Sequence, residues 1–266
     1  MADLCFVTAC MGRLRCLQQS LPPMLGQGGT CIVVDYSCPE QAGDWVCARH
    51  AAAQVVRVPG QAHFNASAAR NAGARHADAP WICFVDSDVV LAPEFSRAIL
   101  PALAPGGYYR AFSSDRGLGG TFVCARADFE RAGGYDEMYR CWGEEDNDLY
   151  DALQFAGLQA RELPESLLAH LAHGDADRTR YYPVTDVVKG HAINRVYRIV
   201  KWDLARLNRE LVNLETRRAL YARISAVIAE SLESGRPADL AVTVPPGLVP
   251  GGRSLSRRLT YRLGAL

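Results

Sequence analysis

Apolar runs and helical segments alternate through the first 90 residues, and this alternation constrains the fold more than any other feature of the chain. The strand-like runs are residues 4–9, 31–35, 54–58 and 81–85, and the helical segments between them are residues 13–25, 40–52 and 65–77. Strand–helix repetition with short connections is typical of a parallel sheet wound with helices, an α/β fold. Ligands of such sheets bind beyond the carboxyl ends of the strands. Polar residues at those ends are therefore the first candidates for a functional site.

Acidic residues follow two of these strands. Asp35 closes the second strand, and the sequence Asp86-Ser87-Asp88 closes the fourth. A strongly apolar run leads directly into Asp86, and carboxylates there cannot be buried unpaired. A divalent cation would neutralise them and would also bind the phosphates of a nucleotide. A solvated turn at the end of a strand is the alternative interpretation.

A second cluster of acids is the sequence Trp-Gly-Glu-Glu-Asp-Asn-Asp at residues 142–148. An indole face stacks on a sugar ring, carboxylates accept hydrogen bonds from hydroxyls, and one carboxylate can serve as a general base. The alternative is a solvated acidic first turn of a helix, where negative charge suits the helix dipole.

Two histidines, His170 and His173, are spaced three residues apart. Neutral imidazoles complete the mixed nitrogen and oxygen coordination of ions such as Mn²⁺. A structural role for both histidines is the alternative.

The net charge of zero is the sum of two opposite halves. Residues 1–176 carry 13 basic and 21 acidic side chains, whereas residues 177–266 carry 16 basic and 8 acidic ones. A general nucleic-acid binder needs a basic excess, so this class is excluded and no nucleic-acid partner is expected. The segregation of charge along the chain indicates two functional regions.

Hydropathy leads us to expect a cytoplasmic protein, and the cysteines lead us to expect reduced thiols. No apolar run approaches the about 18 residues of a membrane span, and the N-terminus lacks a charged leader before an apolar stretch. The nine cysteines are odd in number and form no Cys-x-x-Cys pair, and most lie in apolar runs. We expect buried, reduced thiols rather than a zinc site or a disulfide framework.

The basic half has a different pattern. Val200, Leu204, Leu207, Leu211 and Leu214 step by four and three residues, which predicts a long amphipathic helix or a helical pair. We expect a catalytic domain at residues 1–182, a helical extension at 183–235 and a Pro/Gly-rich basic tail at 236–266. The extension is a helical cap, a homodimer interface or a peripheral contact with the inner face of an anionic membrane.

The motifs together resemble a known enzyme family. Asn65-Ala-Ser-Ala-Ala-Arg70-Asn71-Ala-Gly73, followed by Phe84-Val-Asp-Ser-Asp88, is similar to the nucleotide-sugar half of family 2 glycosyltransferases with the GT-A fold. Gly119-Gly120-Thr-Phe, Gly133-Gly134-Tyr-Asp and residues 142–148 resemble the acceptor-side segment of β-1,4-galactosyltransferases and chondroitin-polymerase-type enzymes. The resemblance spans roughly residues 3–182. It implies a Rossmann-like mixed sheet flanked by helices, with the C-terminal helical extension outside the match.

The resemblance also implies roles for individual residues. Asp88 and His173 would ligate Mn²⁺ or Mg²⁺, Asp86 would hold the ribose or the metal shell, and His170 falls where the galactosyltransferases use another ligand. Asp146 matches the catalytic base and Glu145 the residue that grips the acceptor. The residues assigned to substrate binding are Thr8, Arg13, Asp35, Arg70, Asn71, Asp86, Gly119, Gly120 and Trp142. The chain departs from the pattern at Glu144, usually a second glycine, and at Gly117, where related enzymes carry an aromatic residue.

The implied function is a metal-dependent, inverting transfer of a sugar from a UDP-sugar to an acceptor hydroxyl. The transferred sugar is galactose, N-acetylgalactosamine, glucose or glucuronic acid, and the acceptor is a glycan, a lipid-linked sugar or another hydroxyl compound. A nucleotidyltransferase of related fold is one alternative, but residues 9–13 after the first strand hold a single glycine rather than a Gly-rich basic signature. A non-catalytic sugar-binding protein is the other alternative.

Overall fold

The computed structural model describes residues 3–112, 117–172, 174–249 and 253–264, and the chain divides into two compact units. The first unit comprises Met1–Arg140 and Glu145–Thr185, and the second comprises Cys141–Glu144 and Asp186–Leu266. The change of unit after Thr185 lies close to the boundary expected near residue 182. The inclusion of residues 141–144 in the second unit was not expected from the sequence.

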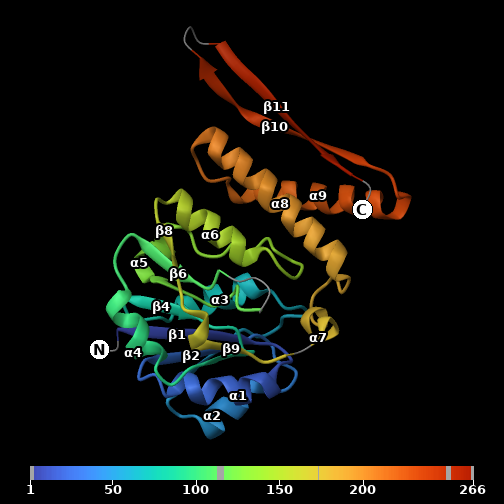
Figure 1. Ribbon diagram of the computed structural model, residues 1–266. Coiled ribbons are helices and arrows are strands. Elements are labelled where there is room, and N and C mark those ends of the chain that lie inside the picture. The colour runs from blue at the N-terminus through green and yellow to red at the C-terminus, as the bar shows by residue number, and fades with distance from the viewer. Residues whose placement is uncertain (1–2, 113–116, 173, 250–252, 265–266) are drawn as a thin grey trace. The chain divides into compact units, whose positions relative to one another are not determined.

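A seven-stranded sheet with the order β3-β2-β1-β4-β7-β6-β8 forms the centre of the first unit (Figure 1). Its strands are β1 (Leu4–Cys10), β2 (Thr30–Asp35), β3 (Ala53–Arg57), β4 (Trp81–Phe84), β6 (Gly107–Arg110), β7 (Phe122–Ala125) and β8 (Gln159–Glu162). The four strands β1 to β4 run parallel, and β7 is antiparallel to both β4 and β6. This mixed sheet confirms the predicted α/β fold.

Helices cover both faces of the sheet, with α1 and α2 on one face and α3 on the other (Figure 1). The helices of this unit are α1 (Leu14–Leu25), α2 (Ala42–Arg49), α3 (Ala66–Ala74), α4 (Phe95–Ile99), η1 (Leu100–Ala102), α5 (Arg126–Arg131), α6 (Glu145–Phe155), η2 (Glu165–Leu167) and α7 (Asp175–Thr179). Because successive strand residues point to opposite faces, Val33 packs with Leu17 and Leu21 of α1, whereas Val34 faces α3. Both faces of the central strands are therefore buried, one under α1 and the other under α3.

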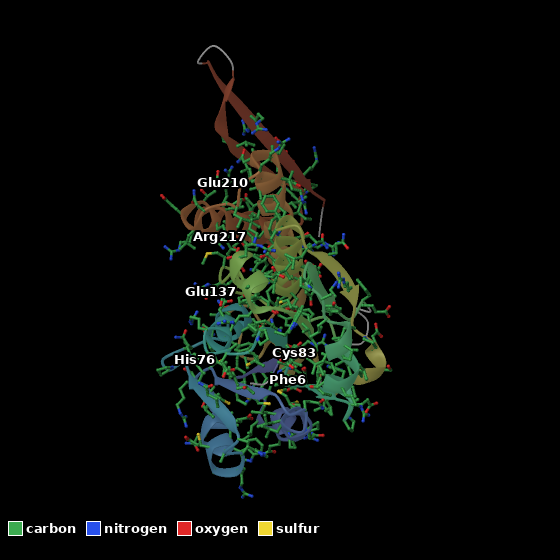
Figure 2. The ribbon with its side chains drawn as sticks, turned by 90° about the vertical axis from the view of Figure 1, so that its left-hand side faces the viewer. Phe6, His76, Cys83, Glu137, Glu210 and Arg217 are labelled. Atoms are coloured by element: carbon green, nitrogen blue, oxygen red, sulfur yellow. The ribbon has the colours of Figure 1, made fainter. Side chains whose placement is uncertain are left out.

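The core of the first unit is formed by fully buried side chains of the central strands, β1 and β4. Phe6 of β1 and Cys83 of β4 are paired across the sheet, and both side chains have no exposed surface (Figure 2). The ring of Phe6 packs against Phe95 of α4 with a centroid separation of 6.2 Å. Seven of the nine cysteines are buried and all nine are free thiols, so they act mainly as small apolar side chains.

A short antiparallel pair joins two distant parts of the first unit. β5 (Val89–Leu91) follows Asp88 directly and pairs with β9 (Leu168–His170), with Val89 opposite His170. These three-residue strands were not predicted from the sequence. The pairing brings His170 to the end of the Asp86–Asp88 segment.

The second unit consists of two long helices and a hairpin. Its elements are α8 (Val187–Asn208), α9 (Leu214–Ser234), β10 (Ala238–Val249) and β11 (Arg253–Leu263). The predicted apolar stripe is buried in part, because Val200 and Leu204 are buried whereas Leu207, Leu211 and Leu214 are 43%, 47% and 44% exposed. No helix in the described part of the chain has both the length and the apolar character that crossing a membrane requires.

The hairpin occupies the segment that the sequence analysis described as a Pro/Gly-rich tail. Leu240 and Val244 of β10 are fully buried, two pleats apart on the same face of the strand. The register of the two strands shifts between Val244 and Gly247, where Pro245 and Pro246 lack the amide hydrogens that a regular ladder needs. The prolines therefore interrupt the strand without ending it.

The contact of α3 with the sheet yields a stability prediction for Gly73→Ala. A Cβ at this position would overlap Cγ1 of Val7 and lie 2.9 Å from Cγ2 of Val34. We expect the free energy of unfolding in urea to fall by about 1–3 kcal/mol, although alanine is the better helix former.

The matched control is Gly26→Ala, at a helical backbone angle of φ −65° and with its nearest contact at an ordinary 3.4 Å. It should leave the unfolding free energy unchanged within about 0.5 kcal/mol. If Gly73→Ala is as stable as the control, α3 does not pack on the sheet as described.

Candidate functional site

Arg70 on α3 binds acidic side chains from two elements that are far apart in the sequence, the end of β4 and the start of α6. Its Nη2 lies 2.6 Å from Asp86 Oδ1, and its Nη1 lies 3.1 Å from both Glu145 Oε1 and Asp146 Oδ1. The Arg70 side chain is only 9% exposed. α3 is fixed in turn by Asn65, which caps the helix by accepting a 2.9 Å hydrogen bond from the Ala68 amide. The end of β4 and the start of α6 therefore meet at one buried cation.

Tyr135 completes this cluster. Its ring lies 5.1 Å from the Arg70 guanidinium carbon, and its hydroxyl donates a 3.2 Å hydrogen bond to Asp146 Oδ1. Asn71 fixes the backbone of Tyr135 with hydrogen bonds of 2.9 Å to its carbonyl and 3.0 Å from its amide. Asn71, predicted to bind substrate, thus holds the turn that presents Tyr135.

Burial and charge shift the pKa values of this cluster. Burial raises the pKa of Asp146 well above its ordinary value; Arg70 opposes this shift, Glu145 and Asp86 add to it, and the Tyr135 hydroxyl opposes it. Burial opposes the charge of Arg70, but the surrounding groups outweigh it and hold the pKa of the guanidinium above its ordinary value. Three carboxyl groups face one guanidinium, so the cluster carries an excess of negative charge when they are ionised.

The glycine pair at residues 119 and 120 allows the backbone to approach this cluster. A Cβ at Gly120 would overlap Asp86 Oδ2 and lie 2.9 Å from Arg70 Nη2. The Gly119 carbonyl accepts a 2.6 Å hydrogen bond from the Tyr150 hydroxyl of α6. Position 120 therefore needs glycine, because a side chain there would collide with Asp86 and Arg70, both predicted site residues.

Asp88 lies between Arg13 and His170. Its Oδ2 forms a short ion pair with Arg13 Nη1 and lies 4.0 Å from His170 Nε2. Asp88 and His170 supply the oxygen and nitrogen donors that Mn²⁺ accepts, so their chemistry fits such an ion. His173 lies outside the described residues, and among those described no group of three or more His, Cys, Asp or Glu side chains could hold a metal ion.

Gly117 lies against His170. It has a φ of +67°, and a Cβ there would lie 2.9 Å from His170 Nε2. A bulky side chain at this position would displace the imidazole. The glycine in place of the aromatic residue of related enzymes is therefore compatible with His170 in its present position.

Thr8 and Asp35, both predicted to contact a nucleotide, are buried, Thr8 inside β1 rather than at its end and Asp35 as the last residue of β2. Asp35 accepts hydrogen bonds of 2.8 Å from the Cys38 amide and 3.0 Å from the Gly43 amide. Thr8 Oγ1 is buried without a hydrogen-bond partner in the described part of the chain. Asp35 thus shapes the turn after β2, and the nucleotide contacts of both residues stay predictions.

Trp142 belongs to the second unit, where the turn at Cys141–Glu144 contacts α8. Glu144 is bound by His191 and Arg198, and Asn194 donates hydrogen bonds to backbone carbonyls of the turn. His191, Asn194 and Arg198 of α8 were not predicted from the sequence as part of the site. Their spacing of three and four residues places them on one helix face, and this is the signal that could have found them.

Part of the chain matches a known protein family, and the matched segment contains many of the residues of this site. Residues 107–174 match the family described as the N-terminal domain of galactosyltransferase. The matched segment contains Gly119, Gly120, Trp142, Glu145, Asp146 and His170. No curated protein matches the chain in sequence.

Several solved glycosyltransferase structures resemble the chain. The mannosyltransferase PcManGT from Pyrobaculum calidifontis, in complex with GDP-Man and Mn²⁺, has a TM-score of 0.54 and 15% identity over 88% of this chain and 75% of that chain. S. aureus TarS 1-349 in complex with UDP-GlcNAc has a TM-score of 0.61 and 12% identity over 86% and 73%. The catalytic domain of Drosophila β1,4-galactosyltransferase 7 with xylobiose has a TM-score of 0.50 and 16% identity over 69% and 76%. At these identities the likeness is one of fold, and it confirms the predicted GT-A fold.

The carboxylate cluster predicts a large effect of Arg70→Met. Removing the cation leaves the carboxylates of Asp86, Glu145 and Asp146 facing one another, so we expect the free energy of unfolding in urea to fall by about 3–5 kcal/mol at neutral pH. The loss should shrink as the pH is lowered, because protonation of the carboxylates removes the uncompensated charge.

Arg126→Met is the matched control, since Arg126 is 44% exposed and its ion pair with Glu130 spans 3.8 Å. We expect it to change stability by no more than about 0.5 kcal/mol. Equal losses in the two variants would contradict the central role of Arg70.

Proposed function

We propose that this glycosyltransferase, whose residues 107–174 form a galactosyltransferase-family domain on a GT-A fold, transfers a sugar from a UDP-sugar to an acceptor hydroxyl with inversion. The observation that carries the proposal is the position of Asp146. Its side chain is 21% exposed at the start of α6, and its carboxylate is linked through Arg70 to Asp86 of the Asp-x-Asp motif. A reachable carboxylate beside the predicted donor site is the arrangement that an inverting transfer needs.

Asp146 is the proposed general base. Arg70 and Tyr135 both bind its Oδ1, and among the described residues Oδ2 has no such partner, so we assign Oδ2 to accept the proton. The raised pKa makes the carboxylate a stronger base than an ordinary aspartate. The acceptor oxygen, deprotonated as it attacks, approaches the anomeric carbon from the face opposite the nucleotide. The nucleotide diphosphate leaves without a general acid, so a single carboxylate is sufficient.

Glu145 is proposed to grip the acceptor. Its Oε1 binds Arg70, whereas its Oε2 is buried and has no hydrogen-bond partner in the described residues. An unsatisfied buried oxygen is costly, and an acceptor hydroxyl that donates to Oε2 would remove that cost. Glu145 thereby orients the acceptor next to Asp146 along α6.

Asp88, His170 and His173 are the residues that would hold a divalent cation, Mn²⁺ or Mg²⁺, with Asp86 beside them. When bound, such a cation supplies positive charge that stabilises the leaving diphosphate. Arg13, which forms an ion pair with Asp88, is proposed to contact the same phosphates. The solved complex of PcManGT with GDP-Man and Mn²⁺ supports this assignment through its similar fold.

The nucleotide and the acceptor are assigned by class. UDP is preferred because the motifs resemble those of UDP-sugar enzymes and TarS, of similar fold, was solved with UDP-GlcNAc. The proposed acceptor is a glycan, a lipid-linked sugar or another hydroxyl compound in the cytoplasm. The exposed Leu207, Leu211 and Leu214 are the proposed contact of the C-terminal helices with a second copy or with the inner face of a membrane.

Asp146→Asn tests the base. We expect sugar transfer, measured as UDP release from a panel of UDP-sugars with Mn²⁺, to fall by about 10²- to 10⁴-fold, because the amide cannot take the proton. The affinity for UDP, measured by calorimetry, should stay at the wild-type value. Asp151→Asn on the same helix serves as the control and should keep full activity. Near-normal turnover by Asp146→Asn would exclude this residue as the base.

Asp88→Ala tests the proposed metal site. In calorimetry with UDP and Mn²⁺, the variant should lose metal-dependent binding, and chelation of the metal from the wild-type chain should weaken UDP binding by at least about tenfold. Asp44→Ala removes an acid that is 61% exposed on α2 and should leave binding unchanged. UDP binding that is indifferent to both the chelator and the variant would contradict metal-dependent donor binding.

A further inference from the structure

Two cysteine thiols meet where the turns after β1 and β2 come together. Cys10 is the last residue of β1, and Cys38 follows β2 in the turn that leads to α2. Their sulfur atoms lie 3.9 Å apart in a hydrogen-bond contact, and both residues are buried, Cys10 being 1% and Cys38 8% exposed. All nine cysteines belong to the described part of the chain, and there no other two form such a contact.

The two thiols of this pair differ in acidity. The hydrogen bond from Cys10 lowers the pKa of the Cys38 thiol, burial opposes this shift, and the backbone amides of Gly12, Ala42 and Glu40 add to it. The pKa of Cys10 is raised by its hydrogen bond to Cys38 and by burial. Cys38 is therefore the member of the pair that carries the thiolate, the nucleophilic form of cysteine, and Cys10 keeps its proton.

The sulfur of Cys38 also holds the turn that follows β1. The Gly12 amide donates a 3.2 Å hydrogen bond to Cys38 Sγ. A second link between the two turns is the 2.7 Å hydrogen bond from the Leu14 amide to Glu40 Oε2. Arg13, the proposed contact of the donor phosphates, lies in the chain between these two hydrogen bonds. The position of its backbone therefore depends in part on one sulfur atom.

We propose that Cys10 and Cys38 form a site of reversible oxidation, at which hydrogen peroxide joins the two sulfurs in a disulfide. The Cys38 thiolate attacks one oxygen of the peroxide, the O–O bond breaks, and Cys38 becomes a sulfenic acid as hydroxide leaves. The Cys10 sulfur then attacks the sulfenic sulfur, and the Cys10 proton leaves with the displaced hydroxyl group as water. The two sulfurs lose two electrons in all, and the peroxide is reduced to water.

Formation of the disulfide should release the Gly12 amide. A disulfide bond is about 2.05 Å long, so the sulfurs must approach each other by about 2 Å. Because Cys10 is held in β1, most of this movement falls on Cys38, whose sulfur leaves the Gly12 amide and also loses its charge. The turn that contains Arg13 then keeps only one of its two links, so oxidation should weaken donor binding. This consequence, unlike the oxidation itself, rests on the proposed function.

Peptide mapping of the full wild-type chain tests the site. The chain is reduced with a phosphine, freed of it, treated with an about tenfold excess of hydrogen peroxide, unfolded in N-ethylmaleimide and digested with chymotrypsin. Chymotrypsin separates residues 7–14, whose one cysteine is Cys10, from residues 37–45, whose one cysteine is Cys38. We expect these peptides as one disulfide-linked species that the phosphine separates. Their recovery as separate peptides, or linked to other cysteines, would overturn the site.

Single substitutions separate the roles of the two thiols. Cys10→Ala keeps the nucleophile and removes its partner, so Cys38 should stop at the sulfenic acid, which dimedone traps. Cys38→Ala should give neither a disulfide nor a dimedone adduct at Cys10. Cys47→Ser removes an exposed cysteine of α2 and is the matched control, which should form the disulfide as the wild type does. Equal dimedone labelling in the two alanine variants would contradict Cys38 as the nucleophile.

Calorimetry with UDP and Mn²⁺ tests the consequence for donor binding. We expect the dissociation constant for UDP to be about fivefold to tenfold higher in the oxidised wild-type chain and in oxidised Cys47→Ser, and the phosphine to restore it. Unchanged affinity in a chain that carries the mapped disulfide would overturn the release of the turn. Absence of UDP binding by the reduced wild-type chain would count against the proposed function, whereas the mapping alone decides the oxidation site.

Discussion

The buried guanidinium of Arg70 holds together parts of the first unit that are far apart in the sequence. It reaches from α3 to Asp86 at the end of β4 and to Glu145 and Asp146 at the start of α6. Buried carboxylates are stable only when paired, so α6 can begin at two adjacent acids because this cation is present. The same charge restrains the pKa of Asp146, which burial alone would raise further. The stability of the fold and the basicity of the proposed catalyst therefore depend on one side chain.

The sequence was informative wherever local pattern determines structure. The apolar runs predicted the strands β1 to β4, and the position of Asp86 and Asp88 directly after one of them placed acids at the edge where ligands of such sheets bind. Which cation each acid meets depends on strand order and helix placement, which local pattern does not encode. The pairing of Arg13 with Asp88 and the alignment of Val89 with His170 were therefore visible only in the structure.

Composition was a weaker guide in the C-terminal region. The leucine stripe predicted helices, but Pro245, Pro246 and Gly247 suggested an irregular tail where the chain forms β10. Leu240 and Val244 stabilise the strand, because burial of these two side chains on one face outweighs the loss of the hydrogen bonds that the prolines cannot make. Glu144 was noted in the sequence as a departure from a glycine pattern. Its meaning needed the structure, because the partners that stabilise its backbone lie on α8.

The discontinuity of the second unit also has a consequence for the order in which the chain is assembled. Proteins are synthesised from the N-terminus, and their domains generally fold as they emerge. Residues 141–144 emerge within the first unit, yet the side chains that fix them come only with α8, after Thr185. During synthesis, residues 141–144 therefore cannot adopt their final contacts until α8 has been made. A completed turn at Trp142–Glu144 therefore marks a chain in which α8 has already formed, and it couples maturation of the proposed active site to the synthesis of that helix.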